Sequence, residues 1–365
     1  MSDQKKSPPP DPINTSGFGS CPIPLFEHPH IVLGHGSGGK LSAELIDKVF
    51  LSAFRNPTLE RMDDQAQLTV GGARLAFTTD SFVVTPIFFP GGDIGTLAVN
   101  GTVNDLAMAG ARPLYLAAAF ILEEGLPADE LSRVVASMAA AAQSAGVQFV
   151  TGDTKVVERG HGDKLFITTT GIGELPASLA LSADRARPGD RILLSGSIGD
   201  HGITILAQRE HLEFESSLTS DCAALNGLVA AMLDELAANT SALRVMRDPT
   251  RGGVATTLNE LAARSQVGIT IRESDILVRE SVRGACELLG LDPLYVANEG
   301  KLIAIVAPDV ADRLLARMQQ HPLGREARII GSVTDVHPGM VLMQTAVGGT
   351  RVVDVLFGEQ LPRIC

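Results

Sequence analysis

The sequence predicts a two-domain protein of mixed α/β (α+β) class. Its 365 residues exceed what a single hydrophobic core usually holds, so about two domains are expected. Strand-like and helix-like hydrophobic patterns occur together in both halves of the chain. Glycine, with 37 residues, exceeds its usual share and indicates several tight backbone loops.

Composition narrows the class of partner. A formal net charge of −12 argues against nucleic acid or an anionic membrane as the main partner. We find no apolar run long enough to cross a bilayer and no apolar signal segment near residue 1. The four cysteines form no C-x-x-C pair, so neither a zinc site nor a disulfide framework is expected. We therefore expect a cytoplasmic protein.

The first half of the chain, residues 31–178, is expected to form one domain. Residues 1–30 are rich in Pro, Ser and Asp, and they predict a disordered leader that contains Cys21. Hydrophobic spacing then predicts a strand at 31–33, a helix at 41–54, hairpin strands at 68–70 and 75–77, a helix at 94–109, a strand at 115–121, a helix from 127, and strands at 147–150 and 165–170.

The second half begins where the pattern weakens, around residues 176–190, and we expect a C-terminal α/β domain at 179–338. Cys222 and Cys286 lie in apolar stretches that read as helical and buried. Residues 339–365 are expected to form a hairpin and a mobile tail. The predicted elements are strands at 191–194, 268–272, 302–306 and 327–333, helices at 200–209 and 220–238, and hairpin strands at 341–343 and 351–355.

Acidic residues recur at strand ends or beside glycine. Carboxylates that converge repel one another, and a hard divalent cation such as Mg²⁺ relieves that repulsion while bridging to phosphate oxygens. Taken singly, each Asp is also a common cap or turn residue. No Walker A or dinucleotide-binding glycine motif is present, so a bound nucleotide needs another device. The acidic spots are Asp63-Asp64, Thr79-Asp80, Asn104-Asp105, Gly152-Asp153-Thr154-Lys155 and Arg247-Asp248.

Three further residues are candidates for chemistry. Lys155 ends what we expect to be a turn after a strand, and Glu299 precedes another strand. Together they could shuttle a proton, or they could form a structural ion pair. The chain ends in Cys365, whose thiol could carry a reacting group on a swinging arm. A frayed terminus is the alternative for this cysteine.

These motifs together resemble those of the hydrogenase maturation factor HypE family, from about residue 31 to the end. The terminal Pro-Arg-Ile-Cys and the long Gly-Asp-Thr-Lys stretch are the most specific. The matching stretches are Gly34-His35-Gly36-Ser37-Gly38-Gly39-Lys40, Phe77-Thr78-Thr79-Asp80-Ser81-Phe82, Gly101-Thr102-Val103-Asn104-Asp105, Gly152-Asp153-Thr154-Lys155-Val156-Val157-Glu158, Asp248-Pro249-Thr250-Arg251-Gly252-Gly253 and Pro362-Arg363-Ile364-Cys365.

The resemblance implies the two-domain fold of the aminoimidazole ribonucleotide synthetase superfamily, with a dimer formed through the N-terminal domains. It implies ATP bound with Mg²⁺ between strand-end aspartates. Asp80, Asp105 and Asp248 match the metal-binding positions, and Asp64 is preferred to Asp63 within a less regular motif. The implied ATP contacts are Gly38, Gly39, Lys40, Asn104, Gly152, Asp153 and Thr154.

The resemblance also implies an activity. A HypF-type carbamoyltransferase loads a carbamoyl group on Cys365, and ATP-dependent dehydration converts it to a thiocyanate, with Lys155 and Glu299 handling the proton. The cyanide then passes to iron on a HypC–HypD complex. Two other readings stay open at this point: another ATP-dependent phosphotransferase or ligase of the superfamily, and a non-catalytic ATP-binding adaptor.

Overall fold

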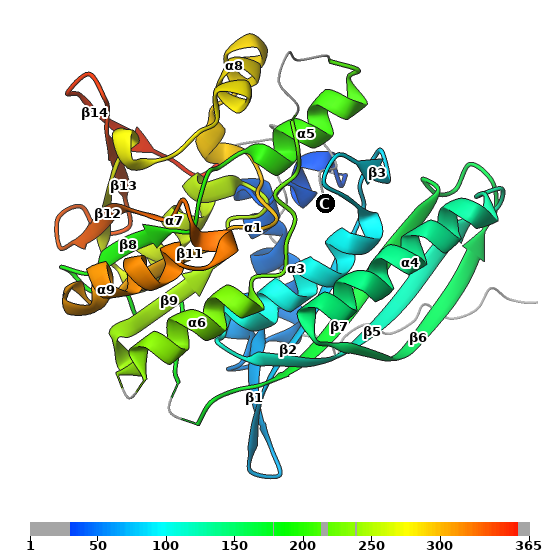
Figure 1. Ribbon diagram of the computed structural model, residues 1–365, viewed down its shortest axis with the longest axis horizontal. Helices are drawn as coiled ribbons and strands as arrows, with labels where there is room; N and C mark the ends of the chain where they lie inside the picture. The colour runs from blue at the N-terminus through cyan, green and yellow to red at the C-terminus, as the bar shows by residue number, and fades with distance from the viewer. Residues whose placement is uncertain (1–29, 178, 213–217, 238, 357–365) are drawn as a thin grey trace, which may run out of the picture.

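A computed structural model describes residues 30–177, 179–212, 218–237 and 239–356 (Figure 1). The predictions for the leader, for Cys21 and for the mobile tail with Cys365 lie outside these residues. Within the described residues the chain forms two main sheets, and β7 of the first sheet ends at Glu174 while β8 of the second begins at Arg191.

The N-terminal sheet has the strand order β1-β2-β7-β5-β6. All neighbouring strands are antiparallel except β5 and β6, which run parallel through a crossover helix, α4. Helices α3 and α4 cover one face (Figure 1). The bounds are β1 Ala66–Val70, β2 Ala73–Phe82, β3 Phe88–Phe89, β4 Gly92–Asp93, α3 Ile94–Met108, β5 Arg112–Glu123, α4 Ala128–Ala145, β6 Gln148–Val157 and β7 Leu165–Glu174.

The other face of this sheet is open as far as the described residues extend. Phe77, Ile172 and Tyr115 face one another across β2, β7 and β5, and they are 40%, 37% and 46% exposed. Side chains alternate between faces along a strand, so Asp153 and Lys155, which pair with Ala119 and Ile121 of β5, lie on this open face too. An apolar row of this kind on a sheet marks an interaction surface.

The C-terminal sheet has the order β14-β13-β10-β12-β8-β11-β9 and packs between helices on both faces (Figure 1). Two buried apolar clusters fill the two interfaces. The bounds are β8 Arg191–Leu194, α5 Asp200–Arg209, α6 Asn226–Leu236, η4 Thr240–Ala242, β9 Leu243–Arg247, α7 Gly253–Ser265, β10 Gly268–Arg272, η5 Glu273–Asp275, α8 Glu280–Leu289, η6 Pro293–Tyr295, β11 Ile303–Val306, α9 Pro308–Gln319, η7 Pro322–Gly324, β12 Arg328–Thr334, β13 Val341–Gln344 and β14 Thr350–Val353.

Helix α3 lies at the centre of the molecule, and its small residues explain how it is buried. Asp93 caps its N-terminus by accepting from the backbone N–H of Thr96 at 2.9 Å. A Cβ atom at Gly95 would lie 2.5 Å from the carbonyl oxygen of Val134 on α4, and one at Gly101 would lie 2.8 Å from the ring of Phe82 on β2. Only glycine permits these two approaches.

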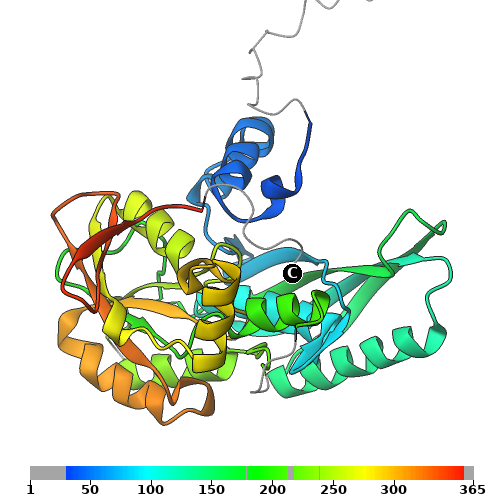
Figure 2. The same cartoon turned by 90° about the horizontal axis from the view of Figure 1, so that it is seen from above.

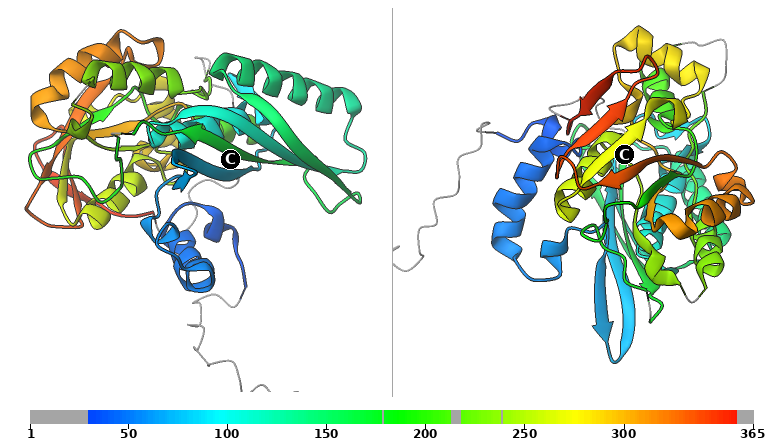
Figure 3. Two further views of the ribbon diagram at one scale, coloured as in Figure 1. Left: turned by 90° about the horizontal axis from the view of Figure 1, so that it is seen from below. Right: turned by 90° about the vertical axis from the view of Figure 1, so that its left-hand side faces the viewer.

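The predicted helix at 41–54 is confirmed as one helical rod with a π-helical middle, and it stands away from both sheets in Figures 2 and 3. The predicted strand at 31–33 is wrong. Leu33–Gly36 forms a 3-10 turn, because the apolar run is short and glycine follows it at once. This segment comprises η1 Leu33–Gly36, α1 Lys40–Leu45, η2 Ile46–Leu51, α2 Ser52–Phe54 and η3 Leu59–Arg61.

Two other local predictions are wrong. The Gly-Asp-Thr-Lys stretch is not a turn but the middle of strand β6, because parallel pairing with β5 continues to Val157. Gly152 is needed there since a Cβ atom would lie 2.4 Å from the carbonyl oxygen of Ala118. Cys222 is not helical and lies in the coil before α6, which begins at Asn226, whereas Cys286 is helical and buried as predicted.

Candidate functional site

Four aspartates from both domains gather around α3. Asp64 precedes β1, Asp80 lies on the helix-covered face of β2, Asp105 lies on α3, and Asp248 follows the last residue of β9. We call these four residues the acidic cluster. They come from four different segments of the chain, so the fold, and not their sequence spacing, brings them together.

The four carboxyl groups lie close enough to one another to affect each other's pKa. Burial is the largest cause that raises the pKa of each of these carboxyl groups. Repulsion from Asp248, Asp80 and Asp64 raises the pKa of Asp105 further, and the pKa of Asp248 itself is raised to about 6. Carboxylates in this situation favour a proton or a bound cation.

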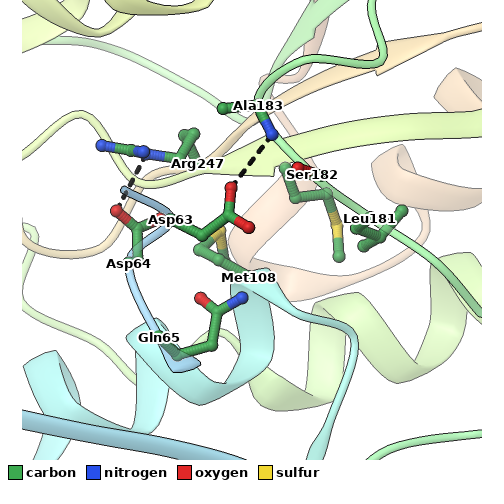
Figure 4. A pocket seen from close by; sticks show the side chains of 9 residues that line it. Asp63, Asp64, Gln65, Met108, Leu181, Ser182, Ala183 and Arg247 are labelled. Atoms are coloured by element: carbon green, nitrogen blue, oxygen red, sulfur yellow. Dashed lines mark hydrogen bonds and ion pairs between the residues drawn. The ribbon is translucent and has the colours of Figure 1, made fainter. Parts of the chain in front are cut away.

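Two arginines, one at the end of β9 and one in the loop after it, balance part of this charge. Arg247 pairs through Nε with Asp64 Oδ1 at 2.8 Å, and Arg251 lowers the pKa of Asp80 by its charge. Asp63 faces elsewhere, because its Oδ1 accepts from the backbone N–H of Ala183 at 3.0 Å (Figure 4). The structure therefore places Asp64, and not Asp63, in the acidic cluster.

The donor set fits Mg²⁺ by its chemistry. All of the ligand atoms are carboxylate oxygens, and among the described residues Asp64 Oδ2 has no hydrogen-bond partner. The described residues hold no group of three or more His, Cys, Asp or Glu side chains poised to bind a metal by themselves. Mg²⁺ is usually held by one or two carboxylates together with substrate phosphates, so an acidic cluster of this kind suits nucleotide-bound Mg²⁺.

The glycine loop Gly34–Lys40 packs on the loop after Asp248 and on the last described residues. Gly38 has φ +77°, and a Cβ atom there would lie 2.7 Å from the Cβ of Arg251. A Cβ atom at Gly39 would lie 2.4 Å from the carbonyl oxygen of Leu356, which accepts from the N–H of Lys40 at 3.0 Å. Gly38 N–H donates to Ser42 Oγ at 2.9 Å. The N–H groups of Gly38 and Lys40 are therefore both engaged within the protein, and phosphate binding by them requires the loop to open.

Glu299 belongs to the site, and Lys155 of the same chain does not reach it. Glu299 is 4% exposed. Its pKa is raised well above the ordinary value, mainly by burial and next by repulsion from Asp248. Lys155 pairs with Asp153 at 2.7 Å on the open face of β6, three strands from β2, or about 14 Å at about 4.8 Å per strand. The expected ATP contacts Gly152, Asp153 and Thr154 share that distant strand.

Some residues that organise the site could not be predicted from the sequence. Thr78 Oγ1 donates to Asp105 Oδ2 at 2.7 Å, and Arg247 holds Asp64. Asn104, expected to bind the nucleotide, uses both N–H bonds of its amide on backbone carbonyls, those of Ala223 and Glu299. Arg247 directly precedes Asp248 in the sequence, and that adjacency was the available signal; nothing in the sequence points to the Thr78 contact.

Comparison with known proteins identifies the family. Residues 62–175 match the N-terminal domain and residues 187–342 the C-terminal domain of the AIR synthase related proteins. A protein of Azotobacter vinelandii named carbamoyl dehydratase HypE is 62% identical over 331 residues, which cover 91% of this chain and 96% of that protein. This chain belongs to the HypE family. The HypE of Cupriavidus necator is 59% identical over 336 residues, 92% of this chain and 95% of that protein.

Solved HypE structures share the fold. A HypE in complex with ATP superposes with a TM-score of 0.76 at 55% identity, covering 92% of this chain and all of that one. A HypE–HypF complex gives a TM-score of 0.81 at 49% identity over 86% of this chain and 99% of that one. Thiamine monophosphate kinase, at 20% identity and a TM-score of 0.59, shares the fold alone. The two-domain architecture expected from the sequence is thereby confirmed.

Proposed function

We propose that this HypE-family chain is an ATP-dependent carbamoyl dehydratase that acts on a carbamoyl group carried by its own Cys365. The observation that carries the proposal is the convergence of the acidic cluster and the buried carboxyl group of Glu299 beside the glycine loop. The names of close relatives, carbamoyl dehydratase HypE, and a relative's complex with ATP support it.

The reaction balances as a dehydration coupled to ATP. The thiocarbamate oxygen attacks the γ-phosphoryl group of ATP and ADP leaves, which turns a poor leaving group into phosphate. One nitrogen proton leaves as the phosphorylated imidate forms, and loss of phosphate with the second nitrogen proton then gives the thiocyanate. The net products are S–C≡N, ADP and inorganic phosphate, and the two nitrogen protons end on phosphate and in solution. We assign the acceptance of a nitrogen proton to Glu299, because its Oε1 is buried and has no hydrogen-bond partner among the described residues.

Asp64, Asp80, Asp105 and Asp248 would hold Mg²⁺, which neutralises charge on the transferring phosphoryl group when it is bound. The repulsion that raises their pKa values is what a bound cation would relieve. Gly38, Gly39 and Lys40 would contact the phosphates after the glycine loop opens. The roles of Lys155, Gly152, Asp153 and Thr154 stay predictions from the family resemblance, because β6 lies across the sheet from the acidic cluster.

The last described residue, Leu356, lies beside the glycine loop, near which the carbamoyl group on Cys365 would have to react. Leu356 is hydrogen-bonded to Lys40 of the glycine loop, and nine residues connect it to Cys365. Nine residues span up to about 30 Å when extended. Cys365 can therefore reach the acidic cluster from its anchored root, and it can also reach outward to a partner.

The proposed partners are those that the family resemblance implies. We propose a HypF-type carbamoyltransferase as donor, in line with a relative's structure in complex with HypF, and a HypC–HypD complex as acceptor. The apolar row on the open sheet face suits a homodimer. We place the reaction in the cytoplasm. Among the described residues, no helix has the length and apolar character that a membrane span requires.

Phosphate release tests this function against its rivals. Carbamoylated protein with Mg²⁺ and ATP should release one phosphate per loaded Cys365, and Cys365→Ser should release none above background. A phosphotransferase acting on a separate small molecule would release or transfer phosphate regardless of Cys365. A non-catalytic adaptor would bind ATP and leave it intact.

A further inference from the structure

Glu299 is an unusual buried acid because one oxygen of its carboxyl group has no hydrogen-bond partner among the described residues. Its side chain is 4% exposed, and Oε1 has no hydrogen-bond partner among the described residues. A buried polar atom without a partner is rare in folded proteins and points to a group that arrives later, such as a substrate. Such a side chain needs another source of order to keep its direction.

The main chain of Glu299 supplies that order, and two side chains from distant segments hold it. Asp221, in the coil before α6, accepts from the N–H of Glu299 through Oδ1 at 3.1 Å. Asn104, on α3 of the N-terminal domain, donates from Nδ2 to the carbonyl oxygen of Glu299 at 3.2 Å. The main-chain N–H and C=O of Glu299 are therefore both fixed, the first by a side chain of the C-terminal half and the second by a side chain of the N-terminal domain.

The side chains of Asn104 and Asp221 are themselves held by further hydrogen bonds to other residues. Asn104 is 1% exposed; its second N–H donates to the carbonyl oxygen of Ala223 at 3.1 Å, and its Oδ1 accepts from Leu225 N–H at 2.8 Å. Asp221 Oδ2 accepts from Lys301 Nζ at 3.0 Å, which balances the carboxylate charge. Both N–H groups and the oxygen of the Asn104 amide, and both oxygens of the Asp221 carboxylate, are thus engaged by protein groups.

The loop around Glu299 is closely packed on both sides. A Cβ atom at Gly300 would lie 1.8 Å from the carbonyl oxygen of Asp221, so only glycine fits. On the other side, Asn298 donates from Nδ2 to the carbonyl oxygen of Pro249 at 2.8 Å and accepts from Gly199 N–H at 2.8 Å. The Glu299 backbone is therefore clamped between the Asp221 segment and the loop that follows Asp248.

We propose that Asn104 and Asp221 are positioning residues that aim the Glu299 carboxyl group into the acidic site for the dehydration step. The inference deepens the proposed function and rests on it for the catalytic role of Glu299. It reassigns Asn104 from the nucleotide to the enzyme's own main chain. Because Asn104 belongs to the N-terminal domain and Asp221 to the C-terminal half, the aim of Glu299 depends on how the two domains dock.

Single-turnover dehydration of preloaded protein tests the proposal. Asn104→Ala and Asp221→Ala should each slow the step about 10- to 100-fold, because misplacing a catalytic group by about 1 Å costs this much. Loading of Cys365 and ATP affinity should stay within twofold of wild type. Asp221→Asn keeps the acceptor for Glu299 N–H, so it should lose less than Asp221→Ala. Asn226→Ala is the matched control: it removes an amide bonded to the Ala145 carbonyl oxygen and away from Glu299.

A second background separates positioning from general damage. In Glu299→Gln, adding Asn104→Ala should slow the residual rate less than twofold, because the aimed group is already gone. Equal fold-losses in both backgrounds, or Asn104→Ala and Asp221→Ala rates equal to that of Asn226→Ala, would overturn the proposal.

Hydrogen exchange judges the geometry without any activity. Amide exchange in the peptide that spans residues 298–302 should accelerate at least about tenfold in Asn104→Ala and Asp221→Ala, and not in Asn226→Ala, because these bonds protect or anchor the Glu299 amide. Unchanged exchange in the first two variants contradicts the positioning. If the wild type loads carbamoyl but never dehydrates it, the proposed function fails, and the exchange result still decides whether Glu299 is held as described.

Discussion

The acidic cluster works through carboxyl groups that are kept close although they repel one another. Burial and mutual repulsion raise the pKa values of Asp64, Asp105 and Asp248, and two arginines offset only part of the charge. The residues that should hold Mg²⁺ are thus the residues that strain the fold when no cation is present. Single substitutions can separate binding from stability at this site.

Asp248 gives the clearest pH signature. Its pKa in the folded protein is about 6, above the ordinary 3.8, so the folded state holds the proton more tightly than the unfolded state does. Ionisation of Asp248 therefore opposes folding, and its contribution to the free energy of unfolding should fall as pH rises from about 4 to about 6, by roughly 2–3 kcal/mol. Urea unfolding without Mg²⁺ at pH 4.5 and 7 should show a smaller fall for Asp248→Asn. Asp234→Asn, an exposed carboxylate on α6, is the control and should match wild type.

The adjacent pair Asp63 and Asp64 allows a matched comparison. Asp64→Asn should lower Mg²⁺-dependent dehydration about tenfold or more, because Asp64 is the member of the pair whose charge acts on Asp105 and which Asp248 repels. Asp63→Asn keeps an acceptor for Ala183 N–H and should stay within about twofold of wild type in a titration of rate against Mg²⁺. The opposite ranking would move the cation to Asp63.

At the scale of elements, the glycine loop and the segment that follows β14 are tied at one point. Lys40 N–H and Leu356 carbonyl oxygen form the bond, and Gly39 provides the space for it. The root of the Cys365 tail is therefore fastened to the loop expected to meet the phosphates. A change in this loop should be felt on both sides of the contact.

Gly39→Ala should break this contact, because its Cβ atom would lie 2.4 Å from a carbonyl oxygen. We expect the free energy of unfolding to fall by about 1–3 kcal/mol, the ordinary cost of overpacking, and ATP affinity to fall with it. Amide exchange at residues 350–356 should rise. Gly36→Ala, with no atom within 4 Å of the added carbon, is the control in the same loop. Equal effects of the two substitutions would show that the contact does not matter.

For the whole molecule, the elements were easier to predict than their arrangement. Hydrophobic period located α3, the Gly71-Gly72 hairpin and most strands, and motif resemblance pointed to Asp80, Asp105 and Asp248. Neither signal could reveal that Lys155 lies on the open face of the N-terminal sheet while Asp80 lies on the covered face. The face of each side chain depends on the strand register, which the whole sheet sets. The contact of Asn104 with the Glu299 backbone, and Asp221 altogether, escaped for a similar reason, since the shared partner is a backbone far away in sequence.

The open sheet face makes a prediction about assembly. Tyr115 lies in the apolar row with Phe77 and Ile172, so Tyr115→Glu should place a charge in the expected dimer interface and raise the dimer dissociation constant about tenfold or more. Analytical ultracentrifugation would measure this. Val347→Glu, at a position 95% exposed on the β13–β14 turn, should leave the dimer unchanged. A dimer unaffected by Tyr115→Glu would place the interface elsewhere.

The central claim is that the chain dehydrates a carbamoyl group on Cys365, and intact mass spectrometry tests it most directly. The protein is loaded by a HypF-type transferase from carbamoyl phosphate and then given Mg²⁺ and ATP. We predict a carbamoyl adduct that loses the mass of one water, is retained in the unprocessed form by Glu299→Gln, and is absent from Cys365→Ala. A loaded adduct whose mass stays unchanged in the wild-type protein with ATP and Mg²⁺ would contradict the account.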